Sequence, residues 1–201
     1  MGRPAVVYNH GKLVEEQGYE GARAMGYDVA AFVNALADAG YVAVAPIRPN
    51  EVSRFSEWQL IAQSGLEYLA TQRGVDPSRR HVIGYSKGGL LTLQNVVGDD
   101  SKLASVVLMS AAPGQGEWGW APYATVDKLQ AIDVPVLATL GEAETGDIPA
   151  NAQKLVNDLQ ALGKPAELKI FDDPHQPATH QWFHEIRPEY WPDILAWLEV
   201  H

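Results

Sequence analysis

The chain has 201 residues, enough for one domain with a hydrophobic core, and 46% of them are hydrophobic and 20% charged, as is usual in globular proteins. Its formal net charge of −10 and its pI of about 4.9 argue against nucleic acids and anionic membranes as partners, because both are bound through basic surfaces. The absence of cysteine excludes disulfides, thiolate catalysis and cysteine metal sites.

The chain shows no targeting or membrane segment. Its longest apolar run, residues 103–113, is interrupted by two serines and is too short to span a bilayer. Residues 1–4 are too short and polar for a signal peptide. We expect a single domain over residues 1–201 that is cytoplasmic by default, the alternative being secretion with a leader already removed. Nothing in the sequence indicates an oligomeric state.

Short β-rich apolar segments alternate with segments that have the apolar spacing of helices. The predicted strands are Ala5–Tyr8, Tyr41–Pro46, Arg80–Tyr85, Ala104–Met109, Pro135–Leu140 and Ala166–Phe171. The predicted helices are Tyr27–Ala39, Ser56–Gln72, Lys87–Val97, Val126–Ala131, Ala150–Leu162 and Tyr190–Val200. A turn is predicted over Gly74–Pro77. The alternation predicts a three-layer α/β/α sandwich with a doubly wound parallel sheet of about six strands, whose ligands bind at the carboxyl ends of the strands.

One segment departs from this alternation. Ala111–Thr125 follows the fourth strand and carries Trp118 and Trp120 among Gly and Pro residues. Because it leaves the carboxyl end of its strand, we expect it to cover a substrate pocket, with these tryptophans and Trp182 in the pocket walls. The alternative is a loop whose tryptophans only seal the edge of the core.

The third strand leads into Gly-x-Ser-x-Gly at residues 84–88, and an apolar helix follows. This order is typical of a nucleophile elbow. A serine hydroxyl is a poor nucleophile, so the backbone must present it on a sharp turn beside a base. Gly84 and Gly88 omit the β-carbons that would collide at such a turn. The motif therefore predicts Ser86 as a nucleophile, the alternative being a glycine-rich turn with an incidental serine.

Three further segments, each following a predicted strand, resemble the α/β-hydrolase superfamily. Residues 8–12 (YNHGK) resemble its oxyanion loop, residues 141–144 (GEAE) its Gly-x-x-acid segment, and residues 180–183 (HQWF) its His-x-Phe/Trp segment. The order Ser, acid, His is the one expected of this fold. Residues 39–46, 75–79 and 84–89 are most similar to the dienelactone-hydrolase-like branch.

Two differences from that branch affect what the resemblance implies. Dienelactone hydrolases use a cysteine nucleophile, whereas this chain has Ser86, which favours ordinary serine esterase chemistry. The two antiparallel strands that often open the fold are also missing. The resemblance therefore implies a minimal α/β-hydrolase fold with an all-parallel sheet.

Acyl transfer requires a base within reach of Ser86 and a carboxylate that orients the base. The family context favours His180 as the base, with His175, nearer the strand end, as the alternative. The resemblance implies Glu144 as the carboxylate, with Asp147 as the alternative.

An oxyanion hole requires two backbone N–H groups. The amide of Lys87, directly after the nucleophile, is one, and the resemblance implies the amide of Lys12 as the other, with His10 in the oxyanion loop beside the pocket. The two lysine side chains could attract a carboxylate-bearing substrate, or could be solvated or paired with Glu117 or Glu15.

Two other patterns lack the necessary context. Residues 114–119 match G-x-G-x-x-G but follow the fourth strand and do not open a helix, so we expect no nucleotide. His180 and His184 have metal-ligand spacing, but no HExxH motif is present, so we expect no metal and no cofactor.

The resemblance thus implies a serine hydrolase that cleaves carboxylic esters of small soluble substrates through an acyl-enzyme. Lactones, thioesters and amides are the alternative substrates, because their hydrolysis passes through the same intermediate. A non-catalytic small-molecule-binding module of the same fold is the alternative outside catalysis.

Overall fold

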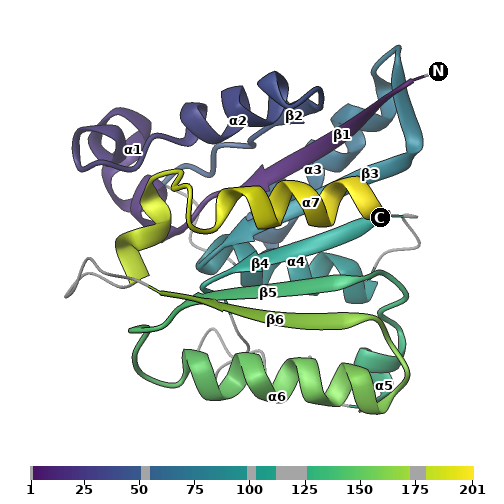
Figure 1. The fold of residues 1–201 in the computed structure, drawn as a ribbon. Coiled ribbons are helices and arrows are strands. Elements are labelled where there is room, and N and C mark those ends of the chain that lie inside the picture. Colours follow the sequence, from purple (N-terminus) through teal and green to yellow (C-terminus); the bar gives the residue numbers. More distant parts are fainter. Residues whose placement is uncertain (1, 51–54, 99–102, 112–125, 173–179) are drawn as a thin grey trace.

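The computed structural model describes residues 2–50, 55–98, 103–111, 126–172 and 180–201. Six strands form one sheet in the order β2-β1-β3-β4-β5-β6 (Figure 1). They are β1 (Arg3–Asn9), β2 (Val42–Val44), β3 (Val75–Tyr85), β4 (Ser105–Met109), β5 (Val136–Gly141) and β6 (Ala166–Phe171). All neighbouring pairs are parallel, so the predicted six-stranded parallel sheet is confirmed.

Helices cover both faces of the sheet, which confirms the three-layer sandwich. The helices are α1 (Lys12–Ala24), α2 (Val29–Asp38), α3 (Phe55–Thr71), α4 (Lys87–Gly98), α5 (Val126–Gln130), α6 (Ile148–Ala161), the 3-10 helix η1 (His180–His184) and α7 (Trp191–Val200). In Figure 1, α7 crosses the front of the sheet and α3 and α4 lie behind it. No helix within the described residues is long and apolar enough to cross a membrane.

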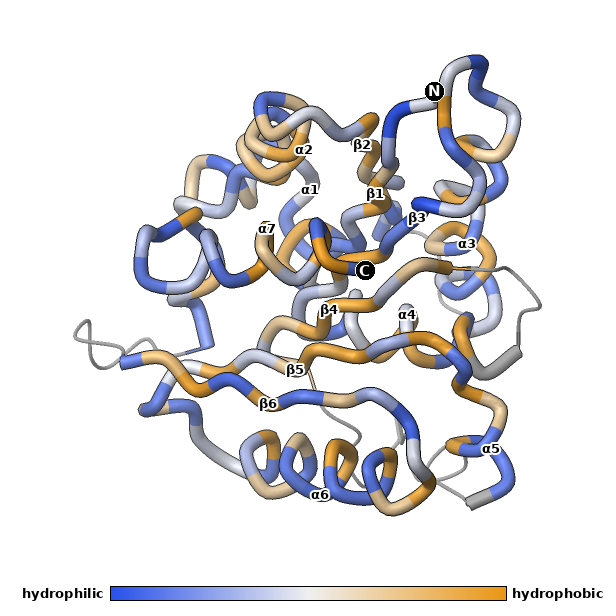
Figure 2. The backbone as a smooth tube through the Cα atoms, turned by 45° about the vertical axis from the view of Figure 1, so that its right-hand side comes forward, coloured by the Kyte–Doolittle hydropathy of each residue, from blue (hydrophilic) through white to orange (hydrophobic). Residues whose placement is uncertain are grey.

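Successive strand residues enter different hydrophobic cores. Tyr8 belongs to a cluster of buried residues that also includes residues of α1, α2, η1 and α7, whereas Val7 belongs to the cluster on the other face, with residues of α3 to α6. Because both faces are covered, β4 and β5 are buried along their whole length and consist largely of apolar residues. Figure 2 shows this as hydrophobic colour along β4 and β5, and as alternating colours along α6.

The helix α1 was not predicted. Its sequence, KLVEEQGYEGARA, contains two glycines, and the backbone leaves helical geometry at Gly18 (φ 70°, ψ 169°). Val14 and Ala22 are its only buried apolar residues. The helix is amphipathic, but two glycines and only two buried apolar residues make it a weak helix signal in the sequence.

The predicted turn before the third strand is only partly correct. Strand β3 already begins at Val75, inside the predicted turn. Asp76 nevertheless accepts hydrogen bonds from the backbone N–H and the hydroxyl of Ser78, at 3.0 and 2.6 Å, which is turn chemistry. The register between β1 and β3 shifts over the same residues. The turn signal therefore marks an irregularity within a strand.

Candidate active site

The side chains of interest follow the carboxyl ends of the strands. The strand order reverses direction between β1 and β3, and in open α/β sheets this switch point is where ligands bind. The residues placed there are His10 after β1, Ser86 after β3, Ser110 after β4, Glu144 after β5 and His180 after β6.

Ser86 occupies a sharp turn between β3 and α4. Its φ of 53° lies in the left-handed region that non-glycine residues rarely adopt. Its N–H donates to the Met109 carbonyl at 2.9 Å, and its own carbonyl accepts from the Gly89 N–H at 2.9 Å. Strain of this kind persists only where the surroundings impose it, and it exposes the Ser86 hydroxyl at the strand end.

Gly88 allows the turn to pack against the loop after β1. A β-carbon on this residue would lie 2.0 Å from the Asn9 carbonyl oxygen and 2.5 Å from that of His10. Both obstacles are backbone atoms, so neither can rotate away.

We expect Gly88→Ala to destabilise the protein by about 3 kcal/mol or more, because the turn and the loop must separate. Gly40→Ala is the matched control: its β-carbon would meet no atom within 4 Å, so it should cost only about 1 kcal/mol for its φ of 96°. Urea unfolding measures both. Equal losses in the two variants would contradict the packing argument.

Three side chains from distant parts of the sequence form one hydrogen-bonded line. The Ser86 hydroxyl lies 2.8 Å from Nε2 of His180, and Nδ1 of His180 lies 3.0 Å from Oε2 of Glu144. The Tyr85 hydroxyl donates to the His180 carbonyl at 2.8 Å and so holds the backbone of η1 against β3. The structure therefore brings together the three residues that the sequence favoured.

Glu144 is buried and well supplied with donors. Its Oε2 accepts from the Ser110 hydroxyl at 2.5 Å as well as from His180, and its Oε1 accepts from the Thr145 N–H at 3.2 Å. Burial alone would raise the pKa of Glu144, but the hydrogen bonds from His180 and Ser110 outweigh it and the pKa is lowered. Glu144 is therefore ionised at neutral pH.

Ser110 was not predicted as a site residue. This residue is buried, has a φ of 42° and directly follows β4. Its position at a strand end beside the elbow was a usable signal. Asp147, the alternative carboxylate, lies at the N-terminal boundary of α6, whereas Glu144 contacts His180. His175, the alternative base, lies outside the described residues.

A pocket of about 300 Å³ opens beside Ser86. Lys12 and Lys87, the first residues of α1 and α4, line it together with Ser86, and Leu90, Ala111 and Ile148 supply apolar walls. Backbone N–H groups in the first turn of a helix have no partner within the helix. The residues whose amides were predicted for the oxyanion hole therefore border the same pocket as the Ser86 hydroxyl.

The side chains of these lysines are engaged with carboxylates. Lys12 pairs with Glu16 at 2.7 Å on the surface, whereas Lys87 forms an ion pair with buried Glu15 and lies 3.0 Å above the centre of the Trp58 ring. For Lys87, pairing with Glu15 was the alternative considered from the sequence.

The prediction that His10 lines the substrate pocket is wrong. The imidazole is fully buried beneath the loop after β1, where it bonds to Gly11 and Arg48. The motif correctly placed the residue in the loop, but strand alternation and the buried Arg48 turn the ring inward.

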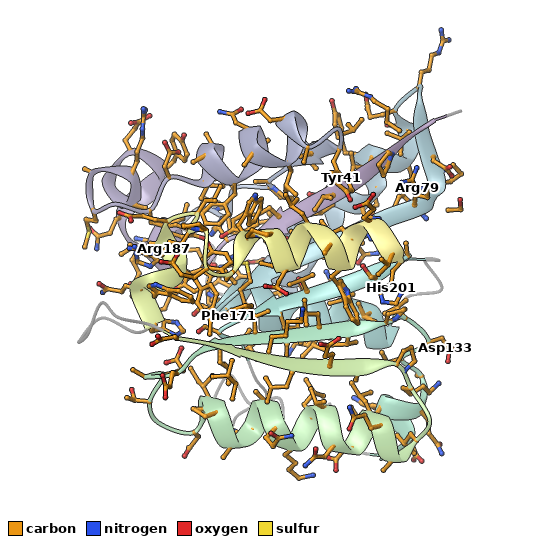
Figure 3. All side chains as sticks on the ribbon, in the orientation of Figure 1. Tyr41, Arg79, Asp133, Phe171, Arg187 and His201 are labelled. Atoms are coloured by element: carbon orange, nitrogen blue, oxygen red, sulfur yellow. The ribbon has the colours of Figure 1, made fainter. Side chains whose placement is uncertain are left out.

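The prediction that Trp182 lines the pocket is also wrong. Trp182 is 2% exposed and packs against Phe171, Phe183 and Tyr190, with ring centres 5.0 to 6.3 Å apart. Figure 3 shows the side chains crowded between α7 and the sheet beside Phe171. A tight 3-10 turn directs His180 to the site and its neighbour Trp182 to the core. Trp118 and Trp120 lie outside the described residues.

Two buried histidines make stability depend on pH. Burial, with a contribution from Arg48, lowers the pKa of His10 to about 3, and burial, with Arg79, lowers that of His81 to about 4. At any pH between these lowered pKa values and about 6.5, the ordinary pKa of histidine, the unfolded chain therefore binds more protons than the native protein.

We expect the free energy of unfolding to be highest above pH 6.5 and to fall as the pH drops towards 4, each histidine contributing on the order of 2 kcal/mol. Urea unfolding at pH 7.5, 5.5 and 4.5 measures this loss. His81→Gln should remove only the share of this loss that comes from His81, whose buried ring bonds to Ser105, because His10 and His184 also have lowered pKa values. A free energy of unfolding that is constant over this range would contradict the assignment of both rings as buried and neutral.

Comparisons with known proteins agree with this fold. A sequence model of the dienelactone hydrolase family matches residues 50–193. A proposed dienelactone hydrolase from Klebsiella pneumoniae is 19% identical with a TM-score of 0.70, the match covering 100% of this chain and 88% of that one. An α/β-hydrolase enzyme from a deep-sea metagenome library is 20% identical (TM-score 0.65; 99% and 81% covered), and an esterase from Pyrococcus furiosus is 16% identical (TM-score 0.70; 98% and 83% covered). At these identities the structural likeness establishes a common fold.

Proposed function

The chain belongs to the dienelactone hydrolase family, and we propose that it is a serine hydrolase that cleaves carboxylic esters of small substrates through an acyl-enzyme. The observation that carries this proposal is the unbroken line of hydrogen bonds from the Ser86 hydroxyl through His180 to Glu144.

In the proposed reaction, the Ser86 oxygen bonds to the ester carbonyl carbon while Nε2 of His180 takes the proton of the Ser86 hydroxyl. The tetrahedral intermediate collapses, His180 gives the proton to the departing alkoxide, and the acyl group stays on Ser86. Water, deprotonated by His180, then attacks the acyl carbon; the bond between this carbon and the Ser86 oxygen breaks, His180 returns the proton to Ser86, and the acid is released. The ionised Glu144 keeps the proton of the neutral imidazole on Nδ1 and stabilises the imidazolium that forms.

The amides of Lys87 and Lys12 would stabilise the oxyanion. Both residues begin helices at the pocket, where the helix dipoles favour negative charge. One such donor is typically worth about 10²–10³ in kcat.

The size of the pocket and the net charge of the protein suggest which kind of substrate it binds. A pocket of about 300 Å³ is at the small end of ligand sites, which favours short acyl groups. The net charge of −10 favours small molecules over nucleic acids or anionic membranes as partners. The dienelactone hydrolase family match favours lactones as a second substrate class.

A substrate panel tests the proposal. We expect turnover of p-nitrophenyl acetate and butyrate by the wild type, weaker turnover of the octanoate, and none above background in Ser86→Ala. A higher kcat/KM for lactones or thioesters would move the assignment to that bond within the same mechanism. A folded wild type that binds esters without hydrolysing them would favour the binding module.

A further inference from the structure

A buried set of polar side chains behind the pocket has no role in the steps above. Arg48 and Glu15 are 0% and 4% exposed. Arg48 Nε donates to Glu15 Oε1 at 2.6 Å, and Glu15 Oε2 pairs with the Lys87 ammonium. Arg48 also donates to the His10 carbonyl oxygen and, through its backbone N–H, to His10 Nε2 at 3.0 Å. Burying charges is costly, so this network calls for an explanation.

The contacts of His10 determine its tautomer. A backbone N–H can only donate, so the Arg48 amide requires Nε2 of His10 to accept. A neutral imidazole then carries its proton on Nδ1, which lies 2.9 Å from the Gly11 carbonyl oxygen and donates to it. The guanidinium nitrogen of Arg48 that lies near Nδ1 donates to the His10 carbonyl oxygen, so it does not need Nδ1 as an acceptor.

These contacts hold the Gly11 peptide groups from both sides. The Gly11 N–H donates to the Tyr27 hydroxyl at 3.0 Å, and the Gly11 carbonyl accepts from His10. In a trans peptide the N–H of the next residue points opposite to the carbonyl. With the carbonyl turned towards buried His10, the Lys12 N–H points away from the ring, and Lys12 lines the pocket with Ser86.

The same network connects the two sides of the pocket. Glu15 lies on α1 one turn after Lys12, and through its ion pair it holds the side chain of Lys87 at the start of α4. Its carboxylate lies between two cations, so these three charged groups carry one more positive than negative charge. A positive charge in a buried setting favours an oxyanion nearby.

We propose that His10, locked in one tautomer by Arg48, is a positioning residue that aims the Lys12 amide at the substrate oxyanion, and that Glu15 fixes this amide relative to that of Lys87. This inference rests on the proposed function, because it assigns a task within the same reaction.

Two substitutions of His10 separate its two hydrogen bonds. Asparagine places an N–H near the position of Nδ1 and keeps the bond to the Gly11 carbonyl, whereas glutamine places an acceptor near Nε2 and loses that bond. We expect His10→Gln to lower kcat by about 10²-fold with KM within about threefold of wild type, and His10→Asn to retain most of kcat. The affinity for a trifluoromethyl ketone, which forms an oxyanion on Ser86, should fall in parallel with kcat, and the pH profile of kcat/KM should keep its midpoint.

His81→Gln and His81→Asn are the matched controls, since they alter another buried histidine, bonded to Ser105, and should lower Tm while leaving kcat unchanged. A His10→Gln variant that keeps wild-type kcat, or a pair of His10 variants that lose kcat equally, would overturn the proposal.

A crystal structure of the wild type phosphonylated on Ser86 gives an answer even if the His10 variants do not fold. The proposal expects the phosphoryl oxygen to accept from the amides of Lys12 and Lys87, and an oxygen bound elsewhere refutes it. A wild type that neither reacts with the phosphonate nor hydrolyses esters would instead refute the proposed function itself, before any variant is compared.

Discussion

Replacing His180 with alanine is expected to lower kcat/KM by about 10⁴- to 10⁶-fold while the protein remains folded. The ring lies 2.8 Å from the Ser86 hydroxyl, and without it that hydroxyl has no described base to take its proton. The side chain is 37% exposed, and the bond from Tyr85 goes to the backbone carbonyl, so the fold loses little. Ester hydrolysis and circular dichroism melting measure the two effects.

Gln181→Ala, at an exposed position in the same 3-10 turn, is the control and should keep wild-type kcat/KM. An active His180→Ala enzyme combined with an inactive His175→Ala enzyme would transfer the role of base to His175.

Replacing Glu144 with glutamine is expected to lower kcat by about 10³- to 10⁴-fold, with little change in KM. The carboxylate is the acceptor that keeps the proton of His180 on Nδ1, and its Oε2 also accepts from Ser110. An amide can present its NH₂ group to Nδ1 instead, which favours the tautomer that cannot accept a proton from Ser86. Initial rates with a p-nitrophenyl ester over a range of concentrations separate kcat from KM.

Asp147→Asn is the matched comparison, because Asp147 lies three residues further on and accepts no side-chain cap hydrogen bond at the start of α6. Its kcat should stay within about twofold of wild type. The reverse pattern, with Asp147→Asn inactive and Glu144→Gln active, would make Asp147 the acid.

The alternation of strands and helices was predictable where a strand is buried on both faces and therefore largely apolar, as in β4 and β5. The segment Ser105–Met109, which is buried throughout, was placed within a residue of its observed ends for this reason. Helix α1 was not predicted, because it buries only two apolar side chains and bends at Gly18. Its position follows from the loop after β1 and from the ion pair of Glu15 with Arg48, a partner 33 residues away.

The site was predictable to the extent that motifs specify position along the chain. Gly-x-Ser-x-Gly places Ser86, and the ends of β5 and β6 place Glu144 and His180. Motifs do not specify which way a side chain points, so His10 and Trp182 were assigned to the pocket although both are buried. The direction of each ring is set by partners from other segments, Arg48 in one case and Tyr190 in the other.

The most direct test of the central claim, that Ser86 is an activated nucleophile, is the intact mass of the protein after incubation with a fluorophosphonate. We expect a single covalent adduct on the wild type, mapped to Ser86, and none on Ser86→Ala. A folded wild type that gains no adduct, or a Ser86→Ala variant that gains the same adduct, would contradict it.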